Sequence, residues 1–190
     1  MQRDRHKPLA IPDAAVRLRG HNRVGVEAIV ALGGNMGDVL TTFLSARKCL
    51  GSTQGLRILD SSCAYRSPPM GPPGQPNYLN AVVLLGADME TEILLQHLQD
   101  IEKQHGRIRT EEHWGPRTLD LDLIAYNDTV MQTKHLTLPH PHMHERMFVL
   151  QPLCDIRPNW RHPVLKQTAR ELLESLAATG VPHLEERRTW

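Results

Sequence analysis

The chain contains few cysteines, and their pattern argues against two classes of protein. Its 190 residues include Cys49, Cys63 and Cys154, which are far apart and form no C-x-x-C pair. An odd number of widely spaced cysteines is not typical of a disulfide framework or of a structural zinc site. We therefore expect a protein of the reducing cytoplasm.

An excess of charge and a long apolar run are also missing. The chain has 22 basic and 21 acidic residues, a formal net charge of +1. Such a chain lacks a general attraction for nucleic acid or for an anionic membrane, so we expect neither as a partner.

No apolar run approaches the roughly 20 residues of a membrane-spanning helix. Residues 1–22 lack the apolar core of a secretory signal, and we predict a flexible leader there, followed by a single domain at 23–190.

Apolar periodicity predicts a succession of strands and helices. We expect strands at 24–32, 56–66, 78–87 and 119–126, and helices at 39–50, 92–105 and 169–177. Up to residue 126 the order is βαββαβ, which predicts a ferredoxin-like α+β fold with an antiparallel sheet and helices packed on one side. The connections 67–77 and 106–118 exceed the usual loop length. We expect them to be active-site loops at one end of the sheet.

Two aspartates stand two residues apart at the start of the last predicted strand. This spacing points the side chains of Asp120 and Asp122 to one face, where they can converge on Mg²⁺. Arg107, Arg109 and Arg117 precede them in a loop rich in glycine and proline. Carboxylates that bind Mg²⁺ beside arginines that bind phosphate are what phosphoryl transfer requires. The pattern predicts a magnesium-dependent nucleotide enzyme, although a solvated strand edge is the alternative on spacing alone.

Aromatic residues are scarce, with two Phe, three Tyr and three Trp. Trp114 stands beside glycine and proline in the second long loop, where contact with a ligand is favoured over packing in a core. Tyr78 and Asn80 share one face of a strand, and an aromatic ring beside an amide suits a flat heterocycle. The pattern is equally compatible with a packed Tyr78 and an Asn80 that caps a turn.

Six segments contain motifs that occur together in one known family. They are ALGGNMGD (31–38), YRSPPMGP (65–72), QPNYLN (75–80), WGPRTLDLD (114–122), LPHPH (138–142) and RMFVLQPL (146–153). In this order, from about residue 24 to 163, the chain resembles the 6-hydroxymethyl-7,8-dihydropterin pyrophosphokinases. The resemblance implies transfer of pyrophosphate from ATP to the hydroxymethyl group of the pterin, with release of AMP, in folate synthesis. A non-catalytic ATP-binding or interaction subunit of the same fold is the alternative.

The resemblance also implies roles for individual residues. The catalytic set would be Arg107, Arg117, Asp120 and Asp122, in which the two aspartates hold two Mg²⁺ ions. The pterin would contact Ser67, Pro68, Met70, Tyr78, Asn80 and Phe148. The co-substrate ATP would contact Gln99, Glu102, Arg107, Arg109, Trp114, Arg117, Leu123, Thr137, His140 and Arg146.

The chain departs from the family pattern at four positions. Gly34 replaces a common serine, Thr110 and His135 replace basic residues of some relatives, and Pro141 replaces a frequent aromatic residue. We expect these changes to affect nucleotide affinity and not the reaction. A zinc site formed by the histidines at 140, 142 and 144 is disfavoured, because zinc prefers about four fixed ligands. A nucleic-acid site around Trp114 is disfavoured by the acidic residues of the same segment.

Overall fold

The structure is a computed structural model, and it describes residues 26–69, 74–107, 115–184 and 187–190. Its helices and strands are β1 (Val26–Gly34), α1 (Val39–Ser52), β2 (Leu56–Ser61), β3 (Ala64–Ser67), β4 (Tyr78–Ala87), α2 (Thr91–Gln104), β5 (Asp120–Tyr126), β6 (Met131–Gln132), β7 (Thr137–Leu138), the 3-10 helix η1 (Met143–Glu145), α3 (Met147–Ile156), α4 (Ala169–Ala178) and β8 (Arg187–Arg188).

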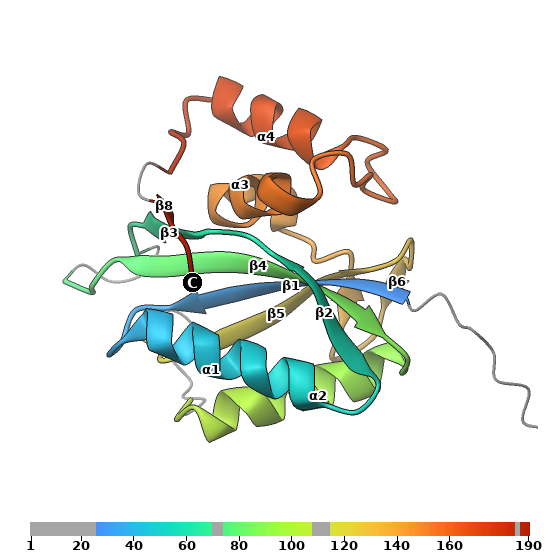
Figure 1. The fold of residues 1–190 in the computed structure, drawn as a ribbon. Helices are drawn as coiled ribbons and strands as arrows, with labels where there is room; N and C mark the ends of the chain where they lie inside the picture. The colour runs from blue at the N-terminus through green and yellow to red at the C-terminus, as the bar shows by residue number, and fades with distance from the viewer. Residues whose placement is uncertain (1–25, 70–73, 108–114, 185–186) are drawn as a thin grey trace, which may run out of the picture.

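The main sheet has the order β5-β1-β4-β3-β8, and β2 also pairs with β4 (Figure 1). Every pair of neighbouring strands in it is antiparallel. The predicted α+β class with an antiparallel sheet is confirmed, whereas its ferredoxin-like detail stays a prediction. Of the two central strands, β4 is buried from Asn80 to Ala87, and β1 is buried or half-buried along its whole length.

Helices cover both faces of this sheet, so the predicted packing on one side is wrong (Figure 1). β1 is apolar on both faces: Val30 packs in the core cluster beneath α1 and α2, and Ile29 packs in the cluster beneath α3. Helix α4 lies outside α3 and packs against it. The sequence analysis missed α3 because Pro152 lies inside it, and proline disfavours a helix interior. None of the helices in the described ranges has the length and apolar character needed to cross a membrane.

The single strand predicted at 56–66 is also wrong, because β2 and β3 are separated at residues 62 and 63. The hydroxyl of Ser62 accepts a hydrogen bond from the backbone N–H of Val82 at 2.9 Å. The amide of Ser62 donates to the carbonyl of Val82, also at 2.9 Å. A side-chain oxygen thus takes the place of a backbone acceptor, and the strand ladder is interrupted there. Across the break the register against β4 shifts by one residue, from Ser61 opposite Val83 to Tyr65 opposite Asn80. β3 then continues along β4 toward the cavity described next.

Candidate active site

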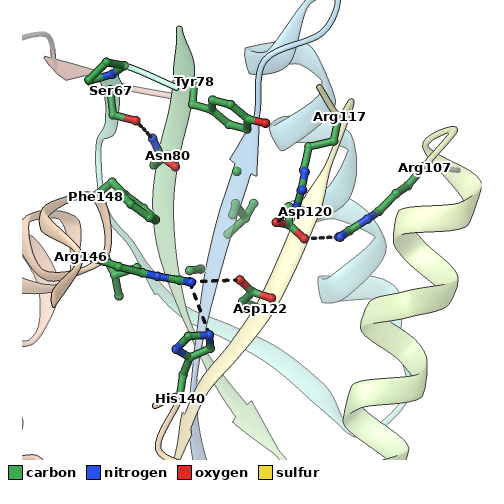
Figure 2. Close-up of a pocket in the computed structure, with 15 residues that line it drawn as sticks. Ser67, Tyr78, Asn80, Arg107, Arg117, Asp120, Asp122, His140, Arg146 and Phe148 are labelled. Atoms are coloured by element: carbon green, nitrogen blue, oxygen red, sulfur yellow. Dashed lines mark hydrogen bonds and ion pairs between the residues drawn. The ribbon is translucent and has the colours of Figure 1, made fainter. Parts of the chain in front are cut away.

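A cavity of about 460 Å³ opens at the end of the sheet where β1, β4, β5 and the start of α3 meet. Figure 2 shows acidic and basic side chains on its β5 side and aromatic and amide side chains on its β4 side. Its lining residues are Ala31, Leu32, Gly33, Ser67, Pro68, Tyr78, Asn80, Arg107, Arg117, Asp120, Asp122, His140, Arg146, Phe148 and Val149. All but Ala31, Leu32, Gly33 and Val149 are among the site residues predicted from the sequence.

The alternation predicted for β5 is confirmed. Asp120 and Asp122 both line the cavity. Leu119, Leu121 and Leu123 are buried in the core cluster on the opposite face. Because the leucines fix the strand against the core, the two carboxylates are held on the cavity side with the spacing of a pleated strand.

Asp120 is bonded to two arginines. Its Oδ1 accepts a hydrogen bond from Arg107, and its Oδ2 accepts one from Nη1 of Arg117 at 2.6 Å (Figure 2). Arg107 also donates to Glu102, whose side chain is almost completely buried. Oε1 of Glu102 in turn accepts the backbone N–H of Leu121 at 2.8 Å. This carboxylate therefore joins helix α2, strand β5 and the arginine at the mouth of the cavity.

Asp122 has a weaker pairing. Among the described residues its nearest cation is Arg146, whose Nη1 lies 4.0 Å from Oδ2. Withdrawal from water and the negative charge of Asp120 raise the pKa of Asp122 from 3.8 to about 6. The side chain is 44% exposed, so water in the cavity screens part of this effect. Burial is the main cause of the raised pKa, and the negative charge of Asp120 adds to it.

The wall on β4 carries the aromatic ring and the amide expected from the sequence. Nδ2 of Asn80 donates to Oγ of Ser67 at 2.8 Å, so β4 and β3 are joined by side chains as well as by backbone. The hydroxyl of Tyr78 donates to the carbonyl of Gly115 at 3.1 Å. Phe148, from the start of α3, also lines the cavity, and the guanidinium of Arg146 lies 5.7 Å from its ring centroid. Both Tyr78 and Asn80 line the cavity, and neither packs in the core or caps a turn.

His140 lies beside Arg146, with Nε2 of the imidazole 3.4 Å from Nη1 of the guanidinium. Burial and the positive charge of Arg146 lower the pKa of His140 to about 4. The imidazole is therefore neutral at pH 7. It adds a polar group and no charge to this end of the cavity.

Asn35 connects three segments around the cavity, a role that the sequence analysis did not identify. Its Oδ1 accepts the N–H of Arg117 at 2.9 Å, and its own N–H donates to the carbonyl of Arg117 at 2.9 Å. Its Nδ2 donates to the carbonyl of Pro76 at 3.2 Å and to Oε1 of Gln75 at 3.4 Å. The described ends of the two long loops thus converge, as predicted. The only signal in the sequence was the asparagine of the glycine-rich motif.

Gly34 makes a close approach that an added side chain would disturb. A Cβ atom at this position would lie 2.6 Å from the carbonyl oxygen of Thr118. We expect Gly34→Ala to lower the free energy of unfolding by about 1–3 kcal/mol, because the backbone before β5 must move. Urea denaturation measures this. Gly51→Ala is the matched control. Gly51 lies inside helix α1, and a Cβ atom there would lie 3.6 Å from the side chain of Ile58, an ordinary van der Waals distance. Equal stability of the two variants would contradict the expectation.

Four residues predicted to bind ATP do not line this cavity as the described residues form it. Glu102 and Leu123 are buried, and Gln99 is half-buried on α2. Thr137 lines a second cavity of about 380 Å³, which His140 also borders. Their roles stay predictions. Met70, Arg109 and Trp114, together with most of the loop 106–118, lie outside the described residues.

Comparison with known proteins gives the family. Residues 29–158 match the sequence model of 7,8-dihydro-6-hydroxymethylpterin-pyrophosphokinase (HPPK). The chain is 46% identical over 154 residues to the 2-amino-4-hydroxy-6-hydroxymethyldihydropteridine pyrophosphokinase of Synechocystis sp., covering 81% of this chain and 78% of that protein. It is 37% identical over 158 residues to the protein of the same name from Methylorubrum extorquens, covering 83% and 98%.

A solved structure shows the same fold. Wild-type HPPK-DHPS of Plasmodium falciparum superposes with a TM-score of 0.64 at 14% sequence identity. The match covers 81% of this chain and 45% of that one. At this identity the likeness shows the fold alone, whereas the sequence matches extend over most of the chain. The chain belongs to the 7,8-dihydro-6-hydroxymethylpterin-pyrophosphokinase (HPPK) family.

Proposed function

We propose that the 460 Å³ cavity is the active site in which this chain transfers pyrophosphate from ATP to 6-hydroxymethyl-7,8-dihydropterin. The reaction, a step in folate biosynthesis, follows from membership of the family. The observation that supports the location is the division of the cavity. Groups suited to a flat heterocycle line one wall, and groups suited to polyphosphate line the other (Figure 2).

The pterin is proposed to lie between the rings of Tyr78 and Phe148. Flat faces on two sides favour a planar bicycle through stacking. The amide of Asn80, held by Ser67, presents polar atoms toward the edge of the ring system. Pro68 and the predicted Met70 would complete this wall. Burial of Asn80 supports this role, since a buried amide discriminates strongly between hydrogen-bonding partners.

The phosphates of ATP are proposed to lie along the opposite wall. Arg107 and Arg117 line it, and Arg146 reaches toward Asp122 from the side of Phe148 (Figure 2). Their fixed positive charges suit phosphate, because guanidinium groups bind phosphate oxygens in a bidentate manner. In the structure, Arg107 and Arg117 are paired with Asp120. Entry of phosphate would give both arginines a second anionic partner. The roles of Arg109 and Trp114 in the same loop are part of this proposal.

Asp120 and Asp122 fit a site for two Mg²⁺ ions. Mg²⁺ prefers carboxylate oxygens, and it usually combines one or two of them with water and phosphate oxygens. The two aspartates would supply the protein ligands, and water and substrate phosphate would complete the coordination. The raised pKa of Asp122 supports a cation there, because a cation relieves the repulsion between the carboxylates. When bound, Mg²⁺ supplies neutralisation of phosphate charge.

The chemical step requires positioning and no protein nucleophile. The hydroxymethyl oxygen of the pterin forms a bond to the β-phosphorus of ATP. The bond from that phosphorus to the oxygen bridging the α-phosphorus breaks, AMP leaves with the electron pair, and the hydroxyl proton passes to water. The stacking wall orients the hydroxyl, and the arginines neutralise the negative charge that moves onto the leaving oxygen.

The assay that tests this proposal uses ATP, Mg²⁺ and 6-hydroxymethyl-7,8-dihydropterin, with AMP and the pterin pyrophosphate separated by chromatography. We expect AMP release that depends on the pterin and is abolished in Asp120→Ala. AMP release at the wild-type rate in this variant would contradict the assignment of the site.

Removal of the Tyr78 ring should weaken pterin binding. For Tyr78→Ala we expect the Kd for the pterin to rise by about 5- to 100-fold, the range found for loss of a stacked aromatic ring. The Kd for ATP should change less, because the Tyr78 ring is proposed to stack on the pterin and only its hydroxyl reaches the wall that carries Arg117. Calorimetric titration with each substrate measures both. Tyr78→Phe keeps the ring and loses the bond to Gly115, so it should retain most of the affinity. If Tyr78→Phe loses as much pterin affinity as Tyr78→Ala, the hydroxyl and not the ring binds the pterin.

A further inference from the structure

Residues 187–190 lie outside the segment that matches the family, which ends at residue 158. They return to the main sheet, where β8 pairs with the outer edge of β3 (Figure 1). β3 contributes only four residues and is paired with β4 on its other edge. Without β8, β3 would be an unpaired edge strand of the sheet.

Trp190 attaches this segment to the body of the protein through three contacts. Its ring packs edge-on against the fully buried Phe43 of α1, with centroids 5.5 Å apart. The guanidinium of Arg47 lies 5.0 Å from the Trp190 ring centroid, and its Nη1 donates to the carbonyl of Trp190 at 3.0 Å. The indole Nε1 donates to the carbonyl of Ser62 at 2.9 Å. Ring, cation and hydrogen bond together fix the orientation of the indole.

The contact with Ser62 lies at the point where the chain leaves β2 and enters β3. Ser62 is buried, and its hydroxyl and amide are already bonded to Val82. Trp190 therefore holds the chain just before β3, at the break where the register against β4 shifts by one residue. At its other end, β3 finishes at Ser67, which accepts the hydrogen bond from Asn80 in the cavity.

We propose that Trp190 is a positioning residue for pterin binding. It fixes β3 through Ser62 and β8, and β3 in turn holds Ser67 against Asn80. Loss of the indole lets β3 shift on β4 and weakens the wall that faces the pterin, while the phosphate wall on β5 is unaffected. The inference rests on the proposed location of the pterin in this cavity.

The test compares three variants of the full chain by calorimetric titration with 6-hydroxymethyl-7,8-dihydropterin and with ATP. For Trp190→Ala we expect the pterin Kd to rise by about three- to tenfold, the size of effect known for residues that act through others, and the ATP Kd to stay within twofold. Trp190→Phe retains ring packing on Phe43 and should fall between this variant and the wild type. Hydrogen exchange of residues 64–67 should accelerate in Trp190→Ala, and exchange of β1 should not.

Leu173→Ala is the control for a general loss of stability. Leu173 is partly buried in the other core cluster, on α4, which packs on α3. It should destabilise the protein without a change in pterin Kd. Weaker pterin binding in Trp190→Ala alone supports the proposal. Equal effects of the Trp190 and Leu173 variants on pterin binding overturn it. If Tyr78→Ala weakens pterin binding and Trp190→Ala does not, the role of Trp190 is contradicted and the proposed pterin site stands. If neither variant weakens pterin binding, both the role of Trp190 and the proposed pterin site are contradicted.

Discussion

Replacement of Asp122 by alanine should lower turnover by about 10²- to 10³-fold, the usual cost of removing one group that stabilises transition-state charge. Asp122 faces the cavity from β5, and among the described residues its nearest cation is Arg146, at 4.0 Å. Its carboxylate is therefore less tightly paired than that of Asp120, which is bonded to two arginines, and it is the better placed of the two to bind Mg²⁺. Steady-state measurement of AMP release gives the turnover.

The same variant should fold as well as the wild type. In the metal-free protein, the carboxylate of Asp122 is destabilised by its surroundings, so its removal relieves a repulsion. Asp128→Ala is the matched control, because Asp128 is exposed in the turn that follows β5. It should alter neither turnover nor stability. If Asp122→Ala unfolds, Asp122 is a structural residue and the assignment of the metal site is wrong.

The raised pKa of Asp122 also predicts a pH dependence of stability. The folded protein binds the proton of Asp122 more tightly than the unfolded chain, because the pKa of this carboxyl is about 6 in the folded protein and has an ordinary value of 3.8. The stabilisation that the bound proton gives to the folded state is fully present below pH 3.8, and it is lost as the pH rises through about 6. We expect the free energy of unfolding of Asp122→Asn, relative to the wild type, to increase between pH 4 and pH 7.

Denaturation in urea with EDTA, at both pH values, measures this difference without bound metal. Because the side chain is partly exposed, we expect a gain of at most about 1 kcal/mol. Comparison of variant with wild type cancels the titration of the groups that do not interact with Asp122. A difference that is constant with pH would show that the pKa of Asp122 is not raised.

Replacement of Glu102 by alanine should lower the free energy of unfolding by about 3–5 kcal/mol, the cost of breaking a buried ion pair from one side. The Glu102 side chain is 2% exposed, and it accepts hydrogen bonds from Arg107 and from the amide of Leu121. In the alanine variant the largely buried guanidinium of Arg107 would lose one of its carboxylate partners, and the buried amide of Leu121 would lose its acceptor. Equilibrium unfolding in urea measures the loss.

Glu102→Gln separates these two causes. The glutamine carbonyl still accepts the amide of Leu121, but the negative charge beside Arg107 is gone. We therefore expect a loss of stability between that of the alanine variant and zero, together with weaker ATP binding if Arg107 is displaced. Wild-type stability of Glu102→Ala would show that neither bond contributes to folding, and Glu102 would return to the direct ATP contact implied by resemblance.

Two pairs of site residues were predictable from local spacing, whereas Ser67, Pro68, His140, Arg146 and Phe148 were predicted only from the family resemblance. The two-residue spacing of Asp120 and Asp122 determined that both face one way, and the same rule placed Tyr78 and Asn80 together. Resemblance to the family then assigned each pair a ligand. The residues missed in the cavity, such as Ala31 and Gly33, carry no chemical signal of their own. Only the pairing of β1 with its neighbours brings their backbone to the cavity.

The sequence by itself determined the order of most elements, the face of each strand and the family, because these follow from periodicity and motifs within short segments. The tertiary structure alone decided how distant segments meet. It placed helix α3 on the second face despite Pro152, and it buried Glu102 beneath Arg107. It also brought Trp190 to Ser62. Such contacts join residues far apart in the chain, and no local pattern specifies them.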